Sequence, residues 1–256
     1  MRLNFGKIFQ EKSKDRRMDG LVNIPWDREL WPLSWKETQY KTYERFPKVD
    51  LPNPFPKEFG HEELIHRKST RDFGKIDVKT GQKDYAQVSL QQISNILYYS
   101  CGEVHKNSDS KNVRRIQPSA GARYPIEAYL LNFEKGDLDM KCYHYNVQGH
   151  CLETLWDIPL ASRKDINTYF GYEWSIHASA VIVLTGAMGR TVMKYGERGY
   201  KYIYLEAGAI LNNMQNNSMI EGLESIILGA TNEKAIESLL DLDGENETVI
   251  MGILLG

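Results

Sequence analysis

The chain has 256 residues, of which 41% are apolar and 26% charged, and its formal net charge is −2 at pH 7. This composition is that of a globular protein with a substantial core, and it argues against a disordered chain or a strongly basic nucleic-acid partner. Three cysteines are too few for a disulfide framework and indicate a reducing, cytoplasmic setting. The N-terminus lacks a signal-peptide core and the longest apolar stretch, 178–184, is too short to span a membrane, so we expect no membrane partner.

The first 60 residues differ in composition from the rest of the chain. Six of the nine prolines lie between Pro25 and Pro56, in a segment that also holds Trp26, Trp31 and Trp35. Proline at this density prevents long helices and central strands, whereas the tryptophans need burial. We therefore predict a tail and a proline- and tryptophan-rich arm over 1–60, packed on the body of the chain or on a partner chain, and one further domain over 61–256.

Beyond residue 60 the spacing of apolar residues predicts a mixture of helices and strands. Helices are expected at 61–69, at 89–102, from about Tyr200 to Gly222 as a long central helix, and at 232–240. Strands are expected at 126–133, 141–147, 149–155, 178–186, 225–229 and 247–256. Because helices and strands do not alternate strictly, the predicted fold class is α+β.

Several short blocks carry side chains suited to a functional site. The run 67–71 (RKSTR) has two arginines and a hydroxyl, which can hold a phosphate, although a basic run is also common on a solvated surface. The run 118–121 (PSAG) has small residues that let the backbone approach a flat ligand, although a tight turn before a strand explains it equally well. Two Lys-Tyr pairs, Lys194-Tyr195 and Lys201-Tyr202, offer proton-transfer groups, with ordinary surface or packing roles as the alternative.

Metal binding has weaker support. Four side chains are chemically suitable zinc ligands, namely Cys142, His144, His150 and Cys151. Their spacing, however, matches no common zinc module. Cys142 and His144 also share one face of the predicted strand, beside aromatic residues. The sequence therefore predicts no metal, and the absence of GxGxxG, GxxxxGK[ST] and GxSxG removes support for nucleotide folds and hydrolases based on them.

Four blocks occur in order over roughly 61–256: R-x-S-x-R, PSAG-x-x-YPIE, KYGERGY-x-Y-x-x-LEAG and GL-x-x-x-x-LGA. As a set they resemble the FMN-dependent nitroreductase superfamily, and within it the SagB-type dehydrogenases, which form thiazole and oxazole rings in peptides. The resemblance implies a nitroreductase-like fold with a central, mainly antiparallel sheet flanked by helices. It also implies an interlocked homodimer with FMN bound at its interface.

The resemblance assigns cofactor contacts residue by residue. The phosphate and ribityl chain of FMN would be held by Arg67, Lys68, Ser69 and Arg71. The flavin ring would lie beside Pro118, Ser119, Ala120 and Gly121. Backbone amides of the turn at Leu228 and Gly229 would face the N5 edge of the flavin.

The resemblance also separates the two Lys-Tyr pairs. Catalysis maps to Lys194 and Tyr195, which precede the RGY motif and which we expect on a flexible loop framed by Gly196 and Gly199. Lys194 would remove the Cα proton of a thiazoline or oxazoline only if its pKa falls well below that of a free lysine, through burial or nearby cations. Tyr195 would orient the substrate or relay the proton, while flavin N5 takes a hydride. Lys201-Tyr202 would belong to the central helix.

The resulting prediction is an FMN-dependent azoline dehydrogenase that acts on a ribosomally made peptide beside a heterocyclase partner. One alternative is an NAD(P)H-dependent reductase of nitroaromatics or quinones. Another is a non-catalytic, flavin-binding scaffold subunit of a peptide-modifying complex. NAD(P)H oxidation with a quinone would favour the first alternative, and a flavin that can be neither reduced nor reoxidised would favour the second.

Overall fold

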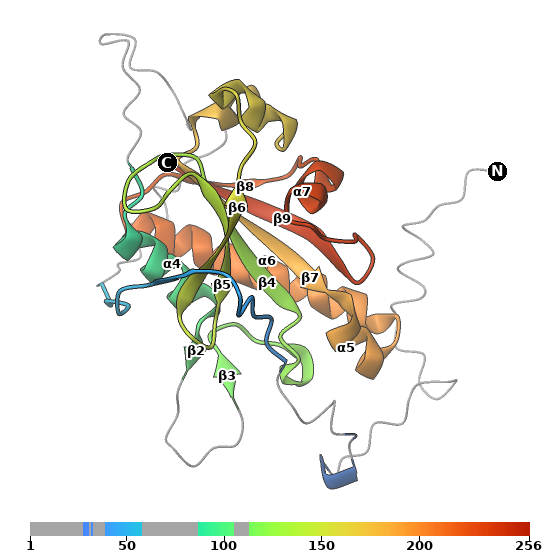
Figure 1. The fold of residues 1–256 in the computed structure, drawn as a ribbon. Coiled ribbons are helices and arrows are strands. Elements are labelled where there is room, and N and C mark those ends of the chain that lie inside the picture. Colours follow the sequence, from blue (N-terminus) through green and yellow to red (C-terminus); the bar gives the residue numbers. More distant parts are fainter. Residues whose placement is uncertain (1–27, 31, 33–38, 58–86, 105–112) are drawn as a thin grey trace, which may run out of the picture.

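The computed structural model describes residues 28–30, 32, 39–57, 87–104 and 113–256 (Figure 1). Within these residues one sheet has the strand order β1-β6-β5-β4-β7-β9-β8, and every neighbouring pair is antiparallel. Its strands are β1 (Lys48–Asp50), β4 (Ile126–Asn132), β5 (Lys141–Asn146), β6 (Cys151–Asp157), β7 (Ala180–Ala187), β8 (Ser225–Leu228) and β9 (Glu247–Leu255). A separate short ladder joins β2 (Glu103–Val104) to β3 (Arg114–Arg115).

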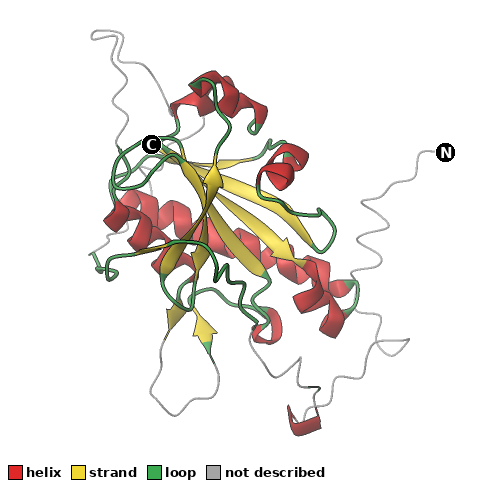
Figure 2. Ribbon diagram, viewed as in Figure 1, coloured by secondary structure: helices red, strands yellow, loops and turns green. Residues whose placement is uncertain are grey.

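Helices cover both faces of the sheet, as the ribbon coloured by secondary structure shows (Figure 2). The α-helices of the described residues are α4 (Leu90–Cys101), α5 (Met188–Tyr195), α6 (Arg198–Ile220) and α7 (Glu233–Leu239). Short 3-10 helices occur at η1 (Arg28–Leu30), η2 (Ala120–Ala122), η3 (Arg163–Thr168) and η4 (Glu173–His177). The predicted α+β class with a central antiparallel sheet is confirmed.

The central strands have continuous apolar sequences because both of their faces are buried. In β7, Ile182 and Leu184 pack with residues of α4 and α6, whereas Val181 and Val183 pack in a second cluster that includes residues of η3 and α7. Successive side chains of a strand point to opposite faces, so a strand buried on both sides has no polar alternation. The strands predicted from these runs are confirmed to within a few residues.

The long central helix is also confirmed. Helix α6 has 23 residues, which corresponds to about 35 Å at 1.5 Å per residue. Its side chains at Ile203, Ala207, Ile210 and Met214 are buried at helical spacing against the sheet. Helix α4 lies within the helix predicted at 89–102. It starts at a capping box formed by Ser89 and Gln92 and ends before Gly102.

Part of the predicted arm packs on its own chain. Strand β1 pairs with β6 at the edge of the sheet, with Val49 opposite Leu152. The tryptophans at 26, 31 and 35 and the helix predicted at 61–69 lie outside the described residues. Domain division near residue 60 stays a prediction.

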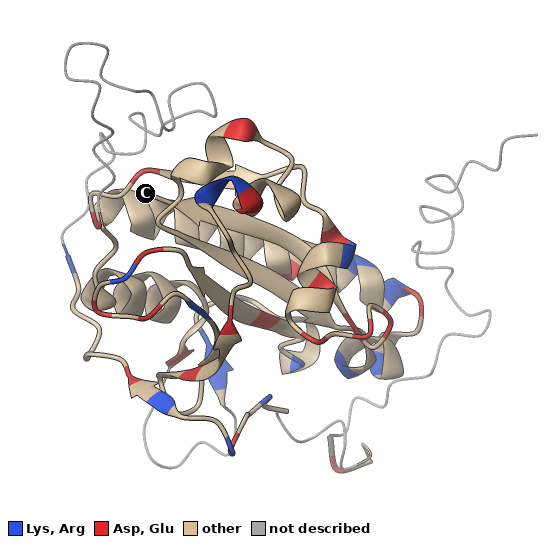
Figure 3. Ribbon diagram, turned by 45° about the horizontal axis from the view of Figure 1, so that its top comes forward, with Lys and Arg blue, Asp and Glu red and all other residues tan. Residues whose placement is uncertain are grey.

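Charged residues of both signs are interspersed along the described chain (Figure 3). One exception is the region of α5 and the start of α6, where Arg190, Lys194, Arg198 and Lys201 are accompanied by Glu197. Among the described helices, none is both long and apolar enough to cross a membrane.

Candidate active site

An exposed turn with the sequence Pro-Ser-Ala-Gly leads into the central strand β4. Residues 118–124 are called the Gly121 turn below. The Oγ of Ser119 accepts a hydrogen bond from the Tyr124 N–H at 2.8 Å. Gly121 has a φ of 62°, and Ala122 and Tyr124 also have positive φ, at 54° and 47°. Non-glycine residues in this conformation cost on the order of 1–3 kcal/mol each, so contacts from the rest of the molecule must hold this turn.

The side chains of Lys194 and Tyr195 meet the Gly121 turn at its glycine. A Cβ atom added to Gly121 would lie 2.9 Å from Lys194 Nζ and would also collide with Tyr195 Oη. Glycine is therefore required here both by its backbone conformation and by the approach of these two side chains. The fold brings the predicted catalytic pair to the turn predicted to contact the flavin ring.

Lys194 and Tyr195 are the last two residues of α5, so the prediction that they lie on a flexible loop is wrong. The Gly196 N–H donates to the carbonyl of Val192 at 2.7 Å, and its φ of 56° ends the helix. Gly199 lies within α6, where a Cβ would come within 2.9 Å of the Val192 backbone. Gly199 therefore allows α5 and α6 to pack closely, whereas Gly196 supplies the conformation that ends α5.

The two side chains of the pair differ in burial, since Lys194 is buried and Tyr195 is half-buried. Lys194 is only 1% exposed, so it is not a solvent-facing residue. Its Nζ lies 5.5 Å from the centroid of the Tyr195 ring. Burial raises the pKa of Tyr195 above its ordinary value, with Tyr202 adding to the shift and Arg123 opposing it. Tyr195 is therefore a neutral phenol at neutral pH and can donate a hydrogen bond.

The second pair, Lys201-Tyr202, lies inside α6 as predicted. Tyr202 packs edge-on against Tyr195, with ring centroids 5.2 Å apart and an interplanar angle of 81°. Its Oη accepts a hydrogen bond from Arg198 Nε at 2.6 Å. Tyr202 thus supports the ring of Tyr195, whereas Lys201 is exposed.

Sequence reasoning missed Glu206, a buried acid of α6 beside the Gly121 turn. Its carboxylate accepts a hydrogen bond from the hydroxyl of Ser119 and another from Gln117 Nε2 at 3.2 Å. Burial raises the pKa of Glu206 to about 7, although both hydrogen bonds act in the opposite direction. A usable signal was present, because this glutamate lies between Ile203 and Ala207 on the apolar side of the predicted helix.

Arg115 of β3 is a second residue that the sequence analysis did not select. Its guanidinium lies 5.0 Å from the ring centroid of Tyr124 and 5.4 Å from that of Tyr40. The side chain is buried, and its Nε and Nη1 have no hydrogen-bond partner in the part of the chain that the structure describes. Unpaired buried donors are uncommon and indicate a place where an acceptor group can bind.

The turn at Leu228 and Gly229 lies elsewhere on the sheet. The strand register places Leu228 level with Tyr129, three strand spacings away, or about 14 Å at 4.8 Å per spacing. Within one chain the sheet therefore separates this turn from Gly121. Gly229 is exposed and faces Tyr172, whose Oη would lie 3.5 Å from an added Cβ.

The remaining candidates divide into two groups. Arg67, Lys68, Ser69 and Arg71 lie outside the described residues, and their role in phosphate binding stays a prediction. For the zinc alternative, no group of three histidine, cysteine or acidic side chains in the described ranges is arranged so that it could hold a metal ion. His144 instead contacts two glutamates, and His150 contacts Ser94 and Tyr145.

Comparison with known proteins identifies relatives of this chain. The nitroreductase family model matches residues 65–256. A Methanocaldococcus jannaschii protein described as a nitroreductase is 24% identical over 185 residues, which are 70% of this chain and 82% of that protein. The trifolitoxin-processing protein TfxB of Rhizobium leguminosarum bv. trifolii is 27% identical over 164 residues, 61% of this chain and 44% of TfxB. The microcin B17-processing protein McbC of Escherichia coli is 23% identical over 195 residues, 72% of this chain and 68% of McbC.

Solved structures share the fold. A protein of Anabaena variabilis described as a nitroreductase has a TM-score of 0.67 at 20% identity, over 97% of this chain and 45% of that one. A chain of the E. coli microcin synthetase McbBCD complex with truncated pro-MccB17 bound has a TM-score of 0.59 at 17% identity. The match covers 98% of this chain and 91% of that one. An Exiguobacterium sibiricum protein in complex with FMN has a TM-score of 0.50 at 10% identity, over 80% of this chain and 90% of that one. The family match over three quarters of the chain, together with this shared fold, shows that the protein belongs to the nitroreductase family.

Proposed function

We propose that the protein is an FMN-dependent oxidoreductase of the SagB type, which oxidises azoline rings of a ribosomally made peptide to thiazoles or oxazoles. The observation that carries the proposal is the convergence of Lys194 and Tyr195 on Gly121. Further support comes from the relatives TfxB and McbC, which are named for processing trifolitoxin and microcin B17. A partner enzyme that forms the azoline is part of the proposal.

The described residues fit FMN in two respects. The Gly121 turn is exposed at Pro118 and Gly121, so its backbone is accessible to a flat ring. Arg115 carries buried donors that have no partner in the described part of the chain and that suit a carbonyl or anionic group. Arg67, Ser69 and Arg71 would hold the phosphate.

In this proposal the chain supplies proton transfer and positioning. FMN, when bound, provides the hydride acceptor that oxidation of the ring requires. Lys194 takes the Cα proton, and its burial meets one condition set for a lysine base. Tyr195 donates a hydrogen bond that orients the ring. The azoline loses one proton and one hydride, and one C=C double bond forms, so atoms and electrons balance.

The proposal includes a homodimer. The turn at Leu228 and Gly229 is separated from Gly121 within one chain, so a second copy is needed to bring the two parts of the expected flavin site together. Light scattering of the purified flavoprotein should give the mass of two chains. A monomer that binds FMN tightly would contradict this part of the proposal.

The test combines a spectrum with two matched lysine variants. The purified protein should show the absorbance bands of oxidised flavin and should convert a synthetic peptide carrying one thiazoline to the thiazole, with dichlorophenolindophenol as electron acceptor. Lys194→Ala should keep the flavin bands and lose about 10²–10⁴-fold in rate, as expected for removal of a general base. Lys201→Ala, which alters the exposed lysine of the second pair, should retain the rate.

Each other outcome has a defined meaning. Normal turnover by Lys194→Ala would remove the base assignment. Rapid NADH oxidation with a quinone, without peptide oxidation, would favour a nitro or quinone reductase. Bound flavin that can be neither reduced nor reoxidised would favour a scaffold subunit, and absence of flavin would overturn the proposal.

A further inference from the structure

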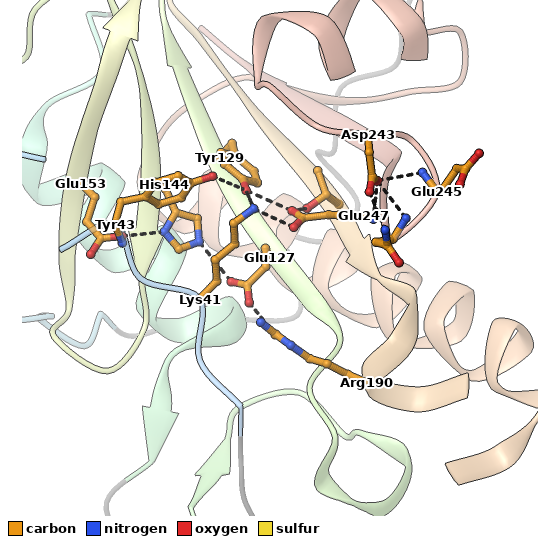
Figure 4. Close-up of polar contacts among 12 residues, drawn as sticks. Lys41, Tyr43, Glu127, Tyr129, His144, Glu153, Arg190, Asp243, Glu245 and Glu247 are labelled. Atoms are coloured by element: carbon orange, nitrogen blue, oxygen red, sulfur yellow. Dashed lines mark hydrogen bonds and ion pairs between the residues drawn. The ribbon is translucent and has the colours of Figure 1, made fainter. Parts of the chain in front are cut away.

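A buried chain of charged side chains crosses the face of the sheet opposite α6 (Figure 4). We call Glu153, His144, Glu127 and Arg190 the His144 network. His144 Nδ1 lies 2.9 Å from Glu153 Oε2, and His144 Nε2 lies 3.2 Å from Glu127 Oε2. Glu127 Oε1 then pairs with Arg190 Nη1 at 2.5 Å. The network runs from β6 through β5 and β4 to helix α5, which carries Lys194.

The charges of the His144 network balance only when the histidine is protonated. Both ring nitrogens face carboxylates, and only an imidazolium can donate from both of them. Burial alone would lower the pKa of His144, but hydrogen bonds to Glu127 and Glu153 outweigh it and raise the pKa above its ordinary value. Two carboxylates are then matched by two cations in a buried site, where an unpaired charge would be costly.

Other groups close the network on its outer side. The Tyr43 N–H donates to Glu153 Oε2 at 2.9 Å, and the Tyr43 ring lies 5.1 Å from the His144 ring. The ring centroid of Tyr129 in β4 lies 5.0 Å from that of His144, and Lys48 Nζ lies 3.6 Å from Glu153 Oε1. Residues of the N-terminal arm therefore exclude water from the side of the network opposite the sheet.

At the Arg190 end of the network, two reciprocal hydrogen bonds hold the Gly121 turn to α5. Arg190 Nη1 donates to the carbonyl of Tyr124 at 2.9 Å. Arg123 Nε donates to the carbonyl of Arg190 at 3.0 Å. Because one helical turn separates residues 190 and 194, these bonds fix the turn of α5 that carries Lys194.

We propose that Arg190 is a positioning residue, held in place by the Glu127–His144–Glu153 chain, that keeps Lys194 and Tyr195 against Gly121. The strained backbone of the Gly121 turn needs such an external restraint, since Ala122 and Tyr124 both have positive φ. The catalytic meaning of this restraint depends on the proposed function. The placement of Lys194 against Gly121 does not depend on the proposed function, so this placement can be tested without flavin or substrate.

The direct test measures how readily the Lys194 amine is acetylated. The full-length protein is treated with acetic anhydride and acetylation is quantified by peptide mass spectrometry. Lys194 should be strongly protected in the wild type because it is buried. Arg190→Met should raise its acetylation rate at least about tenfold, because helix α5 loses its contact with the Tyr124 carbonyl, and Arg190→Lys should restore protection in part.

A matched control is available at the opposite end of the sheet. Arg163 also donates to backbone carbonyls, at 2.8 Å to Ile176 and 3.3 Å to Phe133. Arg163→Met should lower stability without changing the acetylation rate of Lys194. Equal deprotection by Arg163→Met and Arg190→Met would show general loosening and would overturn the proposal.

A double variant guards against misfolding of Arg190→Met. Glu127→Met combined with Arg190→Met removes both charges of the pair, so no charge is left buried alone, and such replacements are often tolerated. Lys194 should still be deprotected in this variant, because the contact to Tyr124 is absent. Wild-type protection of Lys194 in a folded double variant would contradict the positioning role, whatever the outcome for flavin binding or peptide oxidation.

Discussion

Glu127 and Glu206 are both buried near the Gly121 turn, and their pKa values are shifted in opposite directions. Burial acts to raise the pKa of Glu127, but Arg190 and then His144 overcome it and lower the pKa to about 2. For Glu206 burial prevails and raises the pKa to about 7. Hydrogen bonds from Ser119 and Gln117 and the charges of Arg115 and Arg190 act in the opposite direction but do not outweigh it. A nearby cation is therefore not enough to keep a buried carboxylate ionised, whereas the direct ion pair of Glu127 with Arg190 is.

The two glutamates accordingly have different uses. Glu127 stays ionised over the whole working range and serves as a fixed charge that holds Arg190. Glu206 can gain or lose a proton near neutral pH beside the turn expected to contact the flavin. Substitutions and pH can test this contrast.

The sharpest test replaces each glutamate by its neutral isostere. Glu127→Gln leaves the charges of Arg190 and His144 with too few carboxylates in a buried site, so it should lower the free energy of unfolding by about 3 kcal/mol. Glu206→Gln keeps the shape and removes only an unfavourable charge, so at pH 7.5 it should leave stability unchanged or raise it. Urea denaturation of the two variants measures both effects, and equal losses would break the comparison.

The second test uses pH. Because the folded-state pKa of Glu206 is raised from 4.5 to about 7, the folded protein holds a proton that the unfolded chain has lost. The free energy of unfolding should therefore fall as pH rises from about 4.5 to about 7, by at most about 3 kcal/mol at 1.36 kcal/mol per unit. Thermal and urea unfolding across this range should show a smaller fall in Glu206→Gln.

His144 contributes with the same sign at higher pH. Its pKa is raised by its carboxylate partners, so its stabilising effect is complete below its ordinary value of 6.5 and is lost as pH rises through the raised value. The difference between wild type and Glu206→Gln isolates the glutamate from this contribution. Identical pH profiles for these two proteins would show that Glu206 is ionised like an exposed acid.

The third test acts on the turn beside both acids. Gly121→Ala introduces a left-handed alanine, which costs about 1–2 kcal/mol, and a Cβ that collides with Lys194 and Tyr195. We expect a stability loss of that size together with increased acetylation of Lys194. Gly222→Ala, just after the far end of α6, provides a control with a positive φ of 75° and no atom near its added Cβ. If Lys194 were acetylated to the same extent in both variants, strain rather than contact would be responsible.

The smallest effect is expected at the rim of the His144 network. Lys48 Nζ lies 3.6 Å from Glu153 Oε1, but the lysine side chain is 42% exposed. Solvent-screened pairs contribute little, so Lys48→Met should change the free energy of unfolding by less than about 1 kcal/mol. A loss comparable to that of Glu127→Gln would mean that the network depends on its exposed cation as much as on Arg190.

Local patterns were sufficient for most of the fold. Apolar runs at 126–133 and 178–186 indicated strands because both faces of these strands are buried, and the spacing of Ile203, Ala207 and Ile210 indicated the central helix. These signals depend on residues a few positions apart, where helix and strand geometry alone dictates which side chains share a face. The same patterns did not predict α5, where the glycines at 196 and 199 suggested a loop.

From the sequence alone came the order of β4 to β9 and of helices α4, α6 and α7, the α+β class, the likeness to a family, and Lys194 and Tyr195 as candidates. Only the tertiary structure placed Lys194 against Gly121, His144 between Glu127 and Glu153, and Glu206 beside the Gly121 turn. These contacts join residues far apart in the chain, and they arise from the antiparallel register of the sheet and the packing of helices on it. The spacing of apolar residues indicates which face of a helix or strand is buried. Which residues of other elements pack on that face is decided only by the tertiary fold.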